Sequence, residues 1–370
     1  FVPVHFAVDY YGLAKYDGSA LYEYPNNDVG ISEWGSNNFM HSRGEVRSFL
    51  QSCANYWLQT FHFDGLRMDA ISRIIYWHGD EKRGVNGNAV DFIKYMNQGL
   101  KDRNPGCFLA AEDSTNFSNV TKSVSEGGLG FDYKWDMGWM HDTLSYFQMS
   151  PDDRYNNYHK LTFSMMYYYN EKFLLPLSHD EVVHGKATIL QKMYGDYDIK
   201  FPQARAFYMY MMVHPGKKLN FMGNELGQFR EWDEKREQDF MLLDFPIHRA
   251  FNNYIADLNK NYLSHSAFFG KEYDYDGFKW LDCNSPDRLM YSILREDNKS
   301  RIFAIFNFSK YEQIDYRIEL PDNKGVNILM NSDWKCYGGN ADENNVFWHI
   351  DGNTLTCTMP RFSAALFELK

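Results

Sequence analysis

The sequence predicts an α/β protein, with a (β/α)₈ barrel over residues 1–265 followed by an all-β sandwich over residues 266–370. In the first part, short apolar runs alternate with amphipathic segments, and such alternation implies parallel strands joined by crossover helices. Polar residues gather where the apolar runs end, which is typical of the functional face of a barrel. After residue 266 the pattern changes to short strands between turn residues, which indicates an antiparallel sandwich.

Each barrel element is predicted from the spacing of its apolar residues. Strand-like runs occupy residues 62–69, 107–113, 130–135, 173–180 and 218–225. Helical spacing predicts helices over residues 45–60, 89–101, 141–169, 201–213 and 248–263. Residues 7–44 are loop-like, and so long a loop in a compact domain is usually functional. No glycine-rich nucleotide fingerprint follows any strand, so a doubly wound nucleotide-binding sheet has little support.

The sandwich is predicted from eight short apolar segments. They cover residues 278–281, 290–295, 301–308, 316–320, 327–330, 346–350, 354–359 and 364–369. None of these segments carries a cluster of reactive side chains. We therefore expect the sandwich to be structural and to pack on the barrel.

Composition and charge exclude several classes of function. The net charge of −11 without a basic block argues against a nucleic acid or a membrane as partner. The five scattered cysteines predict a reducing, cytoplasmic location and neither disulfides nor a zinc site. We expect a monomer without metal or cofactor. Because the chain opens on Phe1 within an apolar run, it is also expected to be a piece of a longer protein.

Three acids follow predicted barrel strands. Arg67 and Asp69 are two residues apart, so on a strand they share a face, and the guanidinium keeps the carboxylate ionised. Glu112 and Asp180 end two further strands, and the three acids are expected to converge. Two carboxyl groups about 5 Å apart suit glycoside cleavage with retention of configuration, for which Glu112 needs a raised pKa. On pattern alone, each acid is equally well explained as a helix cap or structural ion pair.

Four separated blocks resemble the conserved regions of the α-amylase family, in the family's order. They are Val2–Phe6, Phe63–Ala70, Leu109–Ser114 and Leu175–Lys186. The resemblance implies that Asp69 is the nucleophile, Glu112 the acid/base and Asp180 a further catalytic acid. It also implies that the substrate-binding residues are His5, Arg67 and His179. No metal or organic cofactor is implied.

Within that family the sequence is most similar to the 1,4-α-glucan (glycogen) branching enzymes. This likeness rests on the fourth block and on residues 128–139 and 221–232. It implies cleavage of α-1,4-glucan chains and transfer of the cut segment to a 6-hydroxyl, with glucan chains as donor and acceptor. The alternatives are an amylase-type hydrolase and a non-catalytic glucan-binding fragment. The family's aspartate before the first block, its first barrel strands and its N-terminal module are missing here.

Other residues near these blocks have two possible roles. We interpret His184, Glu225 and Trp232 as support for the wall of the site rather than as direct substrate contacts. Trp135 and Trp139 are as consistent with stacking on glucose rings as with core packing. Asp113 follows Glu112 and points the opposite way on a strand, so it is expected to cap or orient.

Overall fold

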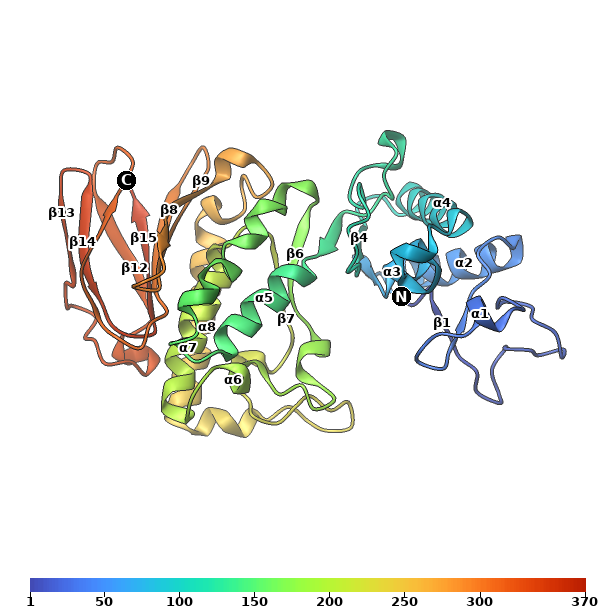
Figure 1. Cartoon of the computed structure of the whole chain (residues 1–370), viewed down its shortest axis with the longest axis horizontal. Helices are drawn as coiled ribbons and strands as arrows, with labels where there is room; N and C mark the ends of the chain where they lie inside the picture. The colour runs from blue at the N-terminus through green and yellow to red at the C-terminus, as the bar shows by residue number, and fades with distance from the viewer. The chain divides into compact units, whose positions relative to one another are not determined.

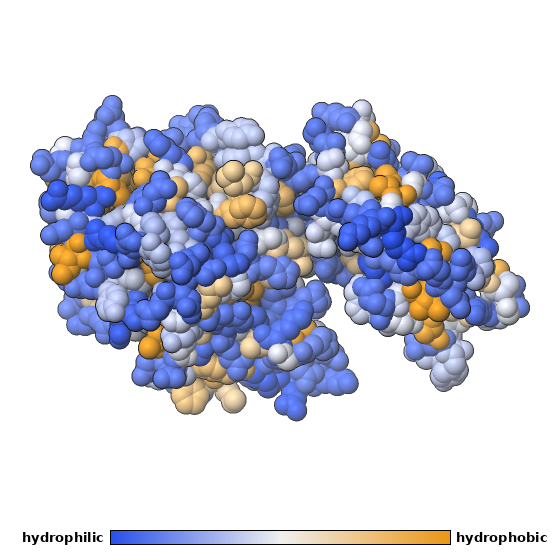
Figure 2. Space-filling model, viewed as in Figure 1, coloured by the Kyte–Doolittle hydropathy of each residue, from blue (hydrophilic) through white to orange (hydrophobic).

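The computed structural model describes all 370 residues, Phe1 to Lys370. They form two compact units: residues 1–137 with 170–174, and residues 138–169 with 175–370. Figure 1 shows the helices and strands of both units. Hydrophilic residues cover most of the face drawn in Figure 2, and hydrophobic residues form small separate patches on it. None of the helices combines the length and apolar character needed to cross a bilayer.

The first unit is built on parallel strands. They are β3 (Gly65–Met68), β4 (Phe108–Ala111), β5 (Tyr133–Trp135) and the start of β6 (Phe173–Leu177), each paired in parallel with the next. Gly65 permits the close pairing of the first two strands, because a Cβ there would lie 2.3 Å from the Phe108 carbonyl oxygen. The strands predicted at these places are confirmed, although they are shorter than the apolar runs.

The first unit also contains helices. They are α1 (Asn27–Gly30), α2 (Gly44–Thr60), α3 (Ile71–Ile75) and α4 (Gly87–Arg103). Helix α2 buries residues at helical spacing, namely Val46, Leu50, Ala54 and Leu58. The side chain of Asn86 caps α4 by accepting from the Ala89 amide. A short ladder of β1 (His5–Phe6) and β2 (Asn37–Asn38) completes the unit. The two predicted helices are confirmed.

The second unit continues the alternation of strands and helices. It contains α5 (Met137–Gln148), α6 (Ile189–Lys192), α7 (Tyr197–Val213), β7 (Lys217–Asn220) and α8 (Pro246–Ser264). The Phe221 amide donates to the Leu177 carbonyl, so β7 runs beside the end of β6. The predicted helices over 201–213 and 248–263 are confirmed. The strand predicted over 218–225 ends early, because Gly223 at φ +94° turns the chain.

The long helix predicted over residues 141–169 is wrong. Helix α5 ends at Gln148, and the chain continues in 3₁₀ turns over Tyr155–Lys160, Phe163–Met166 and Tyr168–Asn170. Pro151 explains the break, because proline disfavours helical backbone at the residue before it. The Tyr158 hydroxyl then donates to the Met290 carbonyl, which ties the turns to the sandwich.

Eight antiparallel strands form the predicted sandwich. They are β8 (Phe278–Ser285), β9 (Met290–Glu296), β10 (Arg301–Asn307), β11 (Gln313–Glu319), β12 (Val326–Asn331), β13 (Trp348–Asp351), β14 (Thr354–Met359) and β15 (Ser363–Leu369). One sheet has the order β12-β15-β10-β9-β8 and the other β11-β14-β13. Phe303 and Phe367 stack across β10 and β15 with centroids 4.7 Å apart. Helix α7 packs on β10 and β15, as expected of a structural sandwich.

Candidate active site

Asp69 directly follows β3 and lies beside Arg67. Its Oδ1 accepts from Arg67 Nη1 at 2.5 Å, as their spacing on one strand face predicts. Leu66 and Met68 alternate with them and are buried in the core. The next residue, Ala70, has left-handed backbone (φ +47°), which is uncommon for a residue with a Cβ and ends the strand abruptly.

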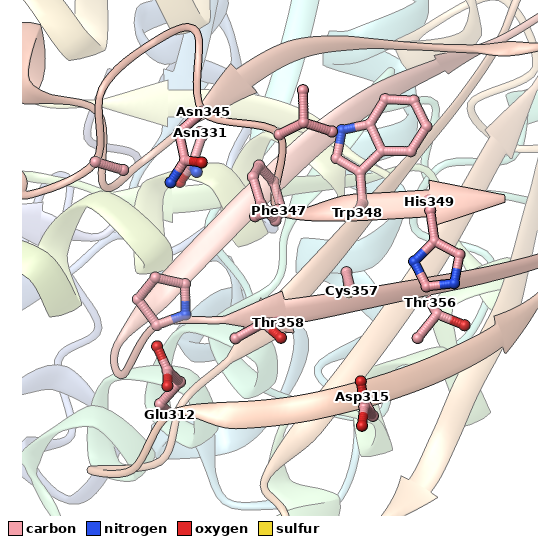
Figure 3. A pocket seen from close by; sticks show the side chains of 13 residues that line it. Glu312, Asp315, Asn331, Asn345, Phe347, Trp348, His349, Thr356, Cys357 and Thr358 are labelled. Carbon is pink, nitrogen blue, oxygen red and sulfur yellow. The ribbon is translucent and has the colours of Figure 1, made fainter.

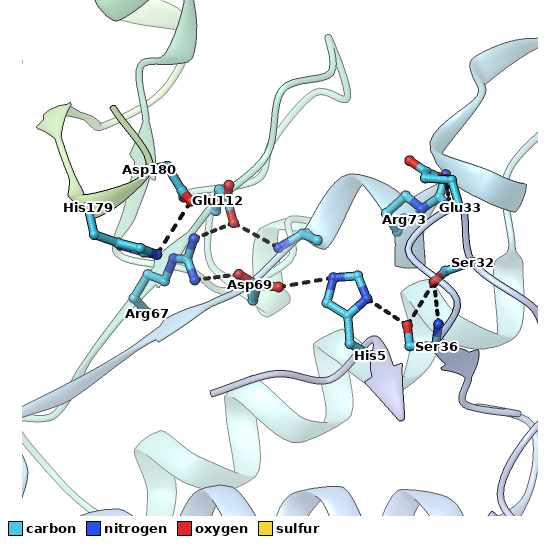
Figure 4. Close-up of polar contacts among 11 residues, drawn as sticks. His5, Ser32, Glu33, Ser36, Arg67, Asp69, Arg73, Glu112, His179 and Asp180 are labelled. Carbon is cyan, nitrogen blue, oxygen red and sulfur yellow. Dashed lines mark hydrogen bonds and ion pairs between the residues drawn. The ribbon is translucent and has the colours of Figure 1, made fainter. Parts of the chain in front are cut away.

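Glu112 follows β4 at the same edge of the sheet, because the register pairs Met68 with Ala111. Glu112 Oε2 accepts from Arg67 Nη2 at 2.5 Å and from the Ala70 amide at 3.0 Å. The Arg67 guanidinium therefore bridges the two carboxylates, as Figure 4 shows. Two carboxylates bridged by one guanidinium are at a separation compatible with the roughly 5 Å between the two carboxyl groups of a retaining glycosidase.

The electrostatics favour an ionised Asp69. Burial of the carboxyl opposes ionisation, but the His5 hydrogen bond and the positive charge of Arg67 outweigh it and lower the pKa of Asp69 to about 2. The Arg67 guanidinium itself lies 4.6 Å from the centroid of the Trp135 ring, a cation–π contact that fixes its plane. The raised pKa expected for Glu112 stays a prediction.

His5 contacts Asp69 from the loop side of the unit. Its Nε2 lies 3.4 Å from Asp69 Oδ2, and its Nδ1 lies 3.0 Å from Ser36 Oγ. Ser36 Oγ is in turn 2.7 Å from Ser32 Oγ, so the imidazole is held from both sides (Figure 4). The sequence analysis missed both serines and Trp34 between them. The only signal for them was the length of the predicted loop over residues 7–44.

Asp113 points away from Glu112, as expected for the next residue. Its carboxylate forms a buried ion pair with Lys134, Nζ to Oδ2 at 2.8 Å. It also accepts from the amide and hydroxyl of Thr115, at 3.0 and 2.9 Å. Asp113 therefore orients the chain after β4 rather than joining the acid pair.

His179 and Asp180 belong to the second unit and lie in a 3₁₀ turn, His179–Val182, directly after β6. Ser178 caps the turn, and Glu181 Oε2 accepts from the amide and hydroxyl of Ser178, both at 2.7 Å. His179 Nε2 lies 3.4 Å from Asp180 Oδ1 (Figure 4). The structure thus brings His5, Arg67, Asp69 and Glu112 together in one unit, and His179 and Asp180 together in the other.

The loop after this turn is held by Glu231. Its two carboxylate oxygens accept from the amides of Gly185 and Ala187 at 2.8 and 2.7 Å, and these bonds hold the pKa of Glu231 below its ordinary value. His184 and Ala187 both have left-handed backbone, at φ +57° and +66°. A loop with such backbone persists only where its surroundings fix it.

A pocket of about 380 Å³ adjoins His179 in the second unit. It is lined by His179, Val183, His184, Arg230, Glu231, Trp232, Asp233, Glu234 and Arg236. The Trp232 amide donates to the Val182 carbonyl, and the Trp232 ring packs on Phe221 with centroids 5.3 Å apart. These contacts agree with the wall role expected for His184 and Trp232. Glu225 is not among the lining residues and instead accepts from the Gly223 amide.

Trp135 and Trp139 are both buried, at 4 and 1% exposure. This burial favours the core-packing interpretation over stacking on a ligand.

The sandwich has a hollow of about 580 Å³ that the sequence analysis did not single out (Figure 3). It lies at β11, β13 and β14, and its polar lining includes Glu312, Asp315 and His349. No group of three His, Cys, Asp or Glu side chains in the chain has the arrangement of a metal site.

Solved structures of known proteins share this fold. An α-amylase from Geobacillus thermoleovorans, complexed with acarbose, matches with a TM-score of 0.68 at 14% identity, over 100% of this chain and 76% of that one. A debranching enzyme from Nostoc punctiforme matches with a TM-score of 0.64 at 16% identity, over 98 and 68%. Residues 280–370 match the family model described as alpha amylase, C-terminal all-beta domain. The fold class is thus an incomplete (β/α)₈ barrel with a C-terminal all-β domain, that of the α-amylases.

The chain belongs to the α-amylase family, and within it is similar to curated 1,4-alpha-glucan branching enzymes. One from Bacillus cereus is 41% identical over 93% of this chain and 54% of its own length. Another, from Clostridium perfringens, is 42% identical over 99% of this chain and 58% of its own length. The chain thus spans a little over half the length of these relatives.

Proposed function

We propose that the protein carrying this sequence is a 1,4-α-glucan branching enzyme of glycogen synthesis. The observation that carries the proposal is the pair Asp69 and Glu112, bridged by Arg67 at neighbouring strand ends, in a chain 41% identical to relatives of that name. Its donor and acceptor are α-glucan chains. The proposal includes a monomer, a cytoplasmic location and a barrel–sandwich division at residues 265 and 266. The five free cysteines support a reducing compartment.

In the first step, Asp69 attacks the anomeric carbon of an α-1,4-linked glucose while Glu112 donates its proton to the departing oxygen. The glycosidic bond breaks, and a covalent glycosyl–Asp69 ester forms. In the second step Glu112 takes the proton of an acceptor 6-hydroxyl, whose oxygen displaces Asp69 and forms an α-1,6 bond. Two inversions give net retention. The low pKa of Asp69, about 2, supports its role because the nucleophile has to be ionised near neutral pH.

The remaining residues position the sugar. Arg67 fixes both carboxylates. His5 is assigned to the glucose that Asp69 attacks, where its Nε2–H is shared between the Asp69 carboxylate and a sugar hydroxyl. The proposal assigns His179 and Asp180 to the same glucose, where hydrogen bonds to its hydroxyls would strengthen as the ring gains oxocarbenium character.

The test uses the complete protein with amylose, and compares it with the Asp69→Asn variant. Branching lowers the iodine colour and adds 6-linked branch points with few new reducing ends, whereas hydrolysis releases reducing ends steadily. We expect the first pattern, and a loss of at least about 10³-fold in the variant. Steady release of reducing ends would favour the amylase-type hydrolase, and glucan binding without turnover would favour the binding fragment.

A further inference from the structure

Trp34 is linked to the proposed nucleophile, Asp69, through one intervening side chain, that of His5. Its indole meets the His5 imidazole edge-on, with centroids 4.8 Å apart and planes at 87°. His5 in turn contacts Asp69. No part of the proposed mechanism uses Trp34, and the loop that carries it, residues 32–36, also supplies the serines that hold His5.

The indole is fixed in place by a buried cation. The Arg73 guanidinium lies 4.9 Å from the ring centroid, and the Arg73 side chain is only 8% exposed. Arg73 is itself held by an ion pair with Glu33 and by donation to the His78 carbonyl. A short turn, in which the Gly35 amide donates to the Ser32 carbonyl, sets the backbone on either side of Trp34.

Trp34 nevertheless remains 61% exposed. The two other tryptophans considered for sugar stacking, Trp135 and Trp139, are buried and present no such surface. Trp57 is partly exposed, but its ring stacks on Phe63 at an interplanar angle of 5° and packs against Phe61. Trp34 therefore combines an open indole, a fixed orientation and a place beside the acid pair.

We propose that Trp34 is a stacking platform for a glucose unit of the glucan chain bound at Asp69. The C–H groups of a glucose ring form an apolar face, and an indole offers a large flat apolar surface with an electron-rich π-system. A cation against the same ring fixes it before the ligand arrives, so little freedom is lost on binding. This inference rests on the proposed function, since it names a subsite of that same glucan site.

The test measures maltoheptaose affinity in the complete protein carrying Asp69→Asn, so that binding is observed without turnover. Adding Trp34→Ala should weaken the affinity by about tenfold, the equivalent of one good aromatic contact. Adding Trp34→Phe should weaken it by about threefold or less, because a flat apolar ring remains. The control is Tyr95→Ala, an exposed aromatic on α4, and it should leave the affinity unchanged.

Equal affinities with and without the Trp34 indole would overturn the inference, as would failure of the Asp69→Asn protein to bind maltoheptaose. The branching assay on the unmutated protein is a separate result. A protein that branches glucans with a Trp34-independent affinity contradicts the platform alone. A protein that binds maltoheptaose through Trp34 yet forms no branch points contradicts the proposed function alone.

Discussion

The two clusters of candidate site residues are held by different interactions. In the first unit, Asp69 and Glu112 are held by side-chain charges, because both pair with Arg67. In the second unit, His179 and Asp180 lie in a turn whose backbone amides donate to carboxylates. Glu181 accepts from the Ser178 amide, and Glu231 accepts from the amides of Gly185 and Ala187 in the loop that follows. The first cluster is therefore sensitive to the shape and charge of one guanidinium, and the second to the geometry of a loop.

This contrast predicts different consequences for changes of similar size. A change at Arg67 alters the positions and ionisation of both carboxylates directly. A change at Glu231 loosens a loop and affects His179 and Asp180 only through it. Four measurements test this difference, and their expected effects decrease in the order given.

Arg67→Lys should cause the largest loss, about 10³-fold in kcat. An ammonium keeps the positive charge but lacks the two parallel N–H groups that hold Asp69 and Glu112 at once. The steady-state rate of branch formation on amylose measures the effect.

The matched control is Arg83→Lys, the same exchange in a surface ion pair with Asp28 whose side chains are 36 and 65% exposed. It should change neither kcat nor stability measurably. An Arg67→Lys enzyme as active as the Arg83→Lys enzyme would show that the bridge does not position the acids.

Acid should destabilise the first unit through His41, whose loop and strand neighbours carry the first cluster. Burial lowers the pKa of His41 to about 4 from its ordinary 6.5. Below pH 6.5 the unfolded chain binds a proton that the folded protein does not, so stability is complete above 6.5 and falls until about pH 4. The loss in the free energy of unfolding is about 3 kcal/mol. Urea unfolding between about pH 7 and pH 4 measures it.

His41→Gln retains a donor for the Pro3 carbonyl, which lies 3.2 Å from His41 Nε2. This variant should show a flatter dependence of stability on pH over the same range. His349→Gln, at an exposed position on β13, should keep the slope of the unmutated protein. An unchanged slope in the His41 variant would mean that His41 is not the group responsible.

Glu231→Gln should lower kcat/KM by about tenfold, because the loosened loop displaces His179 and Asp180. This effect is smaller than that of losing the arginine bridge. The side-chain amide of the glutamine keeps one acceptor oxygen for one backbone N–H. Its NH₂ group faces the other backbone N–H and cannot accept from it, so one of the two hydrogen bonds to the loop is lost. Faster hydrogen exchange at Gly185 and Ala187 would accompany the loss. Glu234→Gln in the same pocket wall is the control, and it should alter neither measurement.

Most of the fold was predictable because its signals are local. Apolar runs ending in acids predicted β3 and β4, and the eight sandwich segments were all confirmed as strands. The helix over 141–169 was wrong because helical spacing of apolar residues also suits 3₁₀ turns whose tyrosines reach the sandwich. Pro151 disfavours a continuous helix at this point, but the periodicity of the apolar residues on either side does not reveal the break.

The first cluster was predictable in part, for a physical reason. Arg67 and Asp69 share a strand face by spacing alone, and the bridge to Glu112 follows once β3 and β4 pair in register. Ser36, Trp34 and Glu231 were missed because each acts from a loop, where no periodicity fixes the direction of a side chain.

Ser36→Ala should have the smallest effect, about a fivefold fall in kcat, since it removes one neutral hydrogen bond. An ionised Asp69 favours the tautomer with the imidazole proton on Nε2, facing the carboxylate, and in that tautomer Nδ1 accepts from the Ser36 hydroxyl. Without the serine hydroxyl, the other tautomer becomes accessible and turns a lone pair toward the carboxylate. Ser36→Thr keeps the hydroxyl and should restore the rate, whereas Ser19→Ala, which removes an exposed hydroxyl bonded to Asp17, should leave it unchanged. If the alanine and threonine enzymes are equally slow, the shape of the loop rather than the His5 tautomer limits the rate, and the first cluster then depends on its loop as the second does.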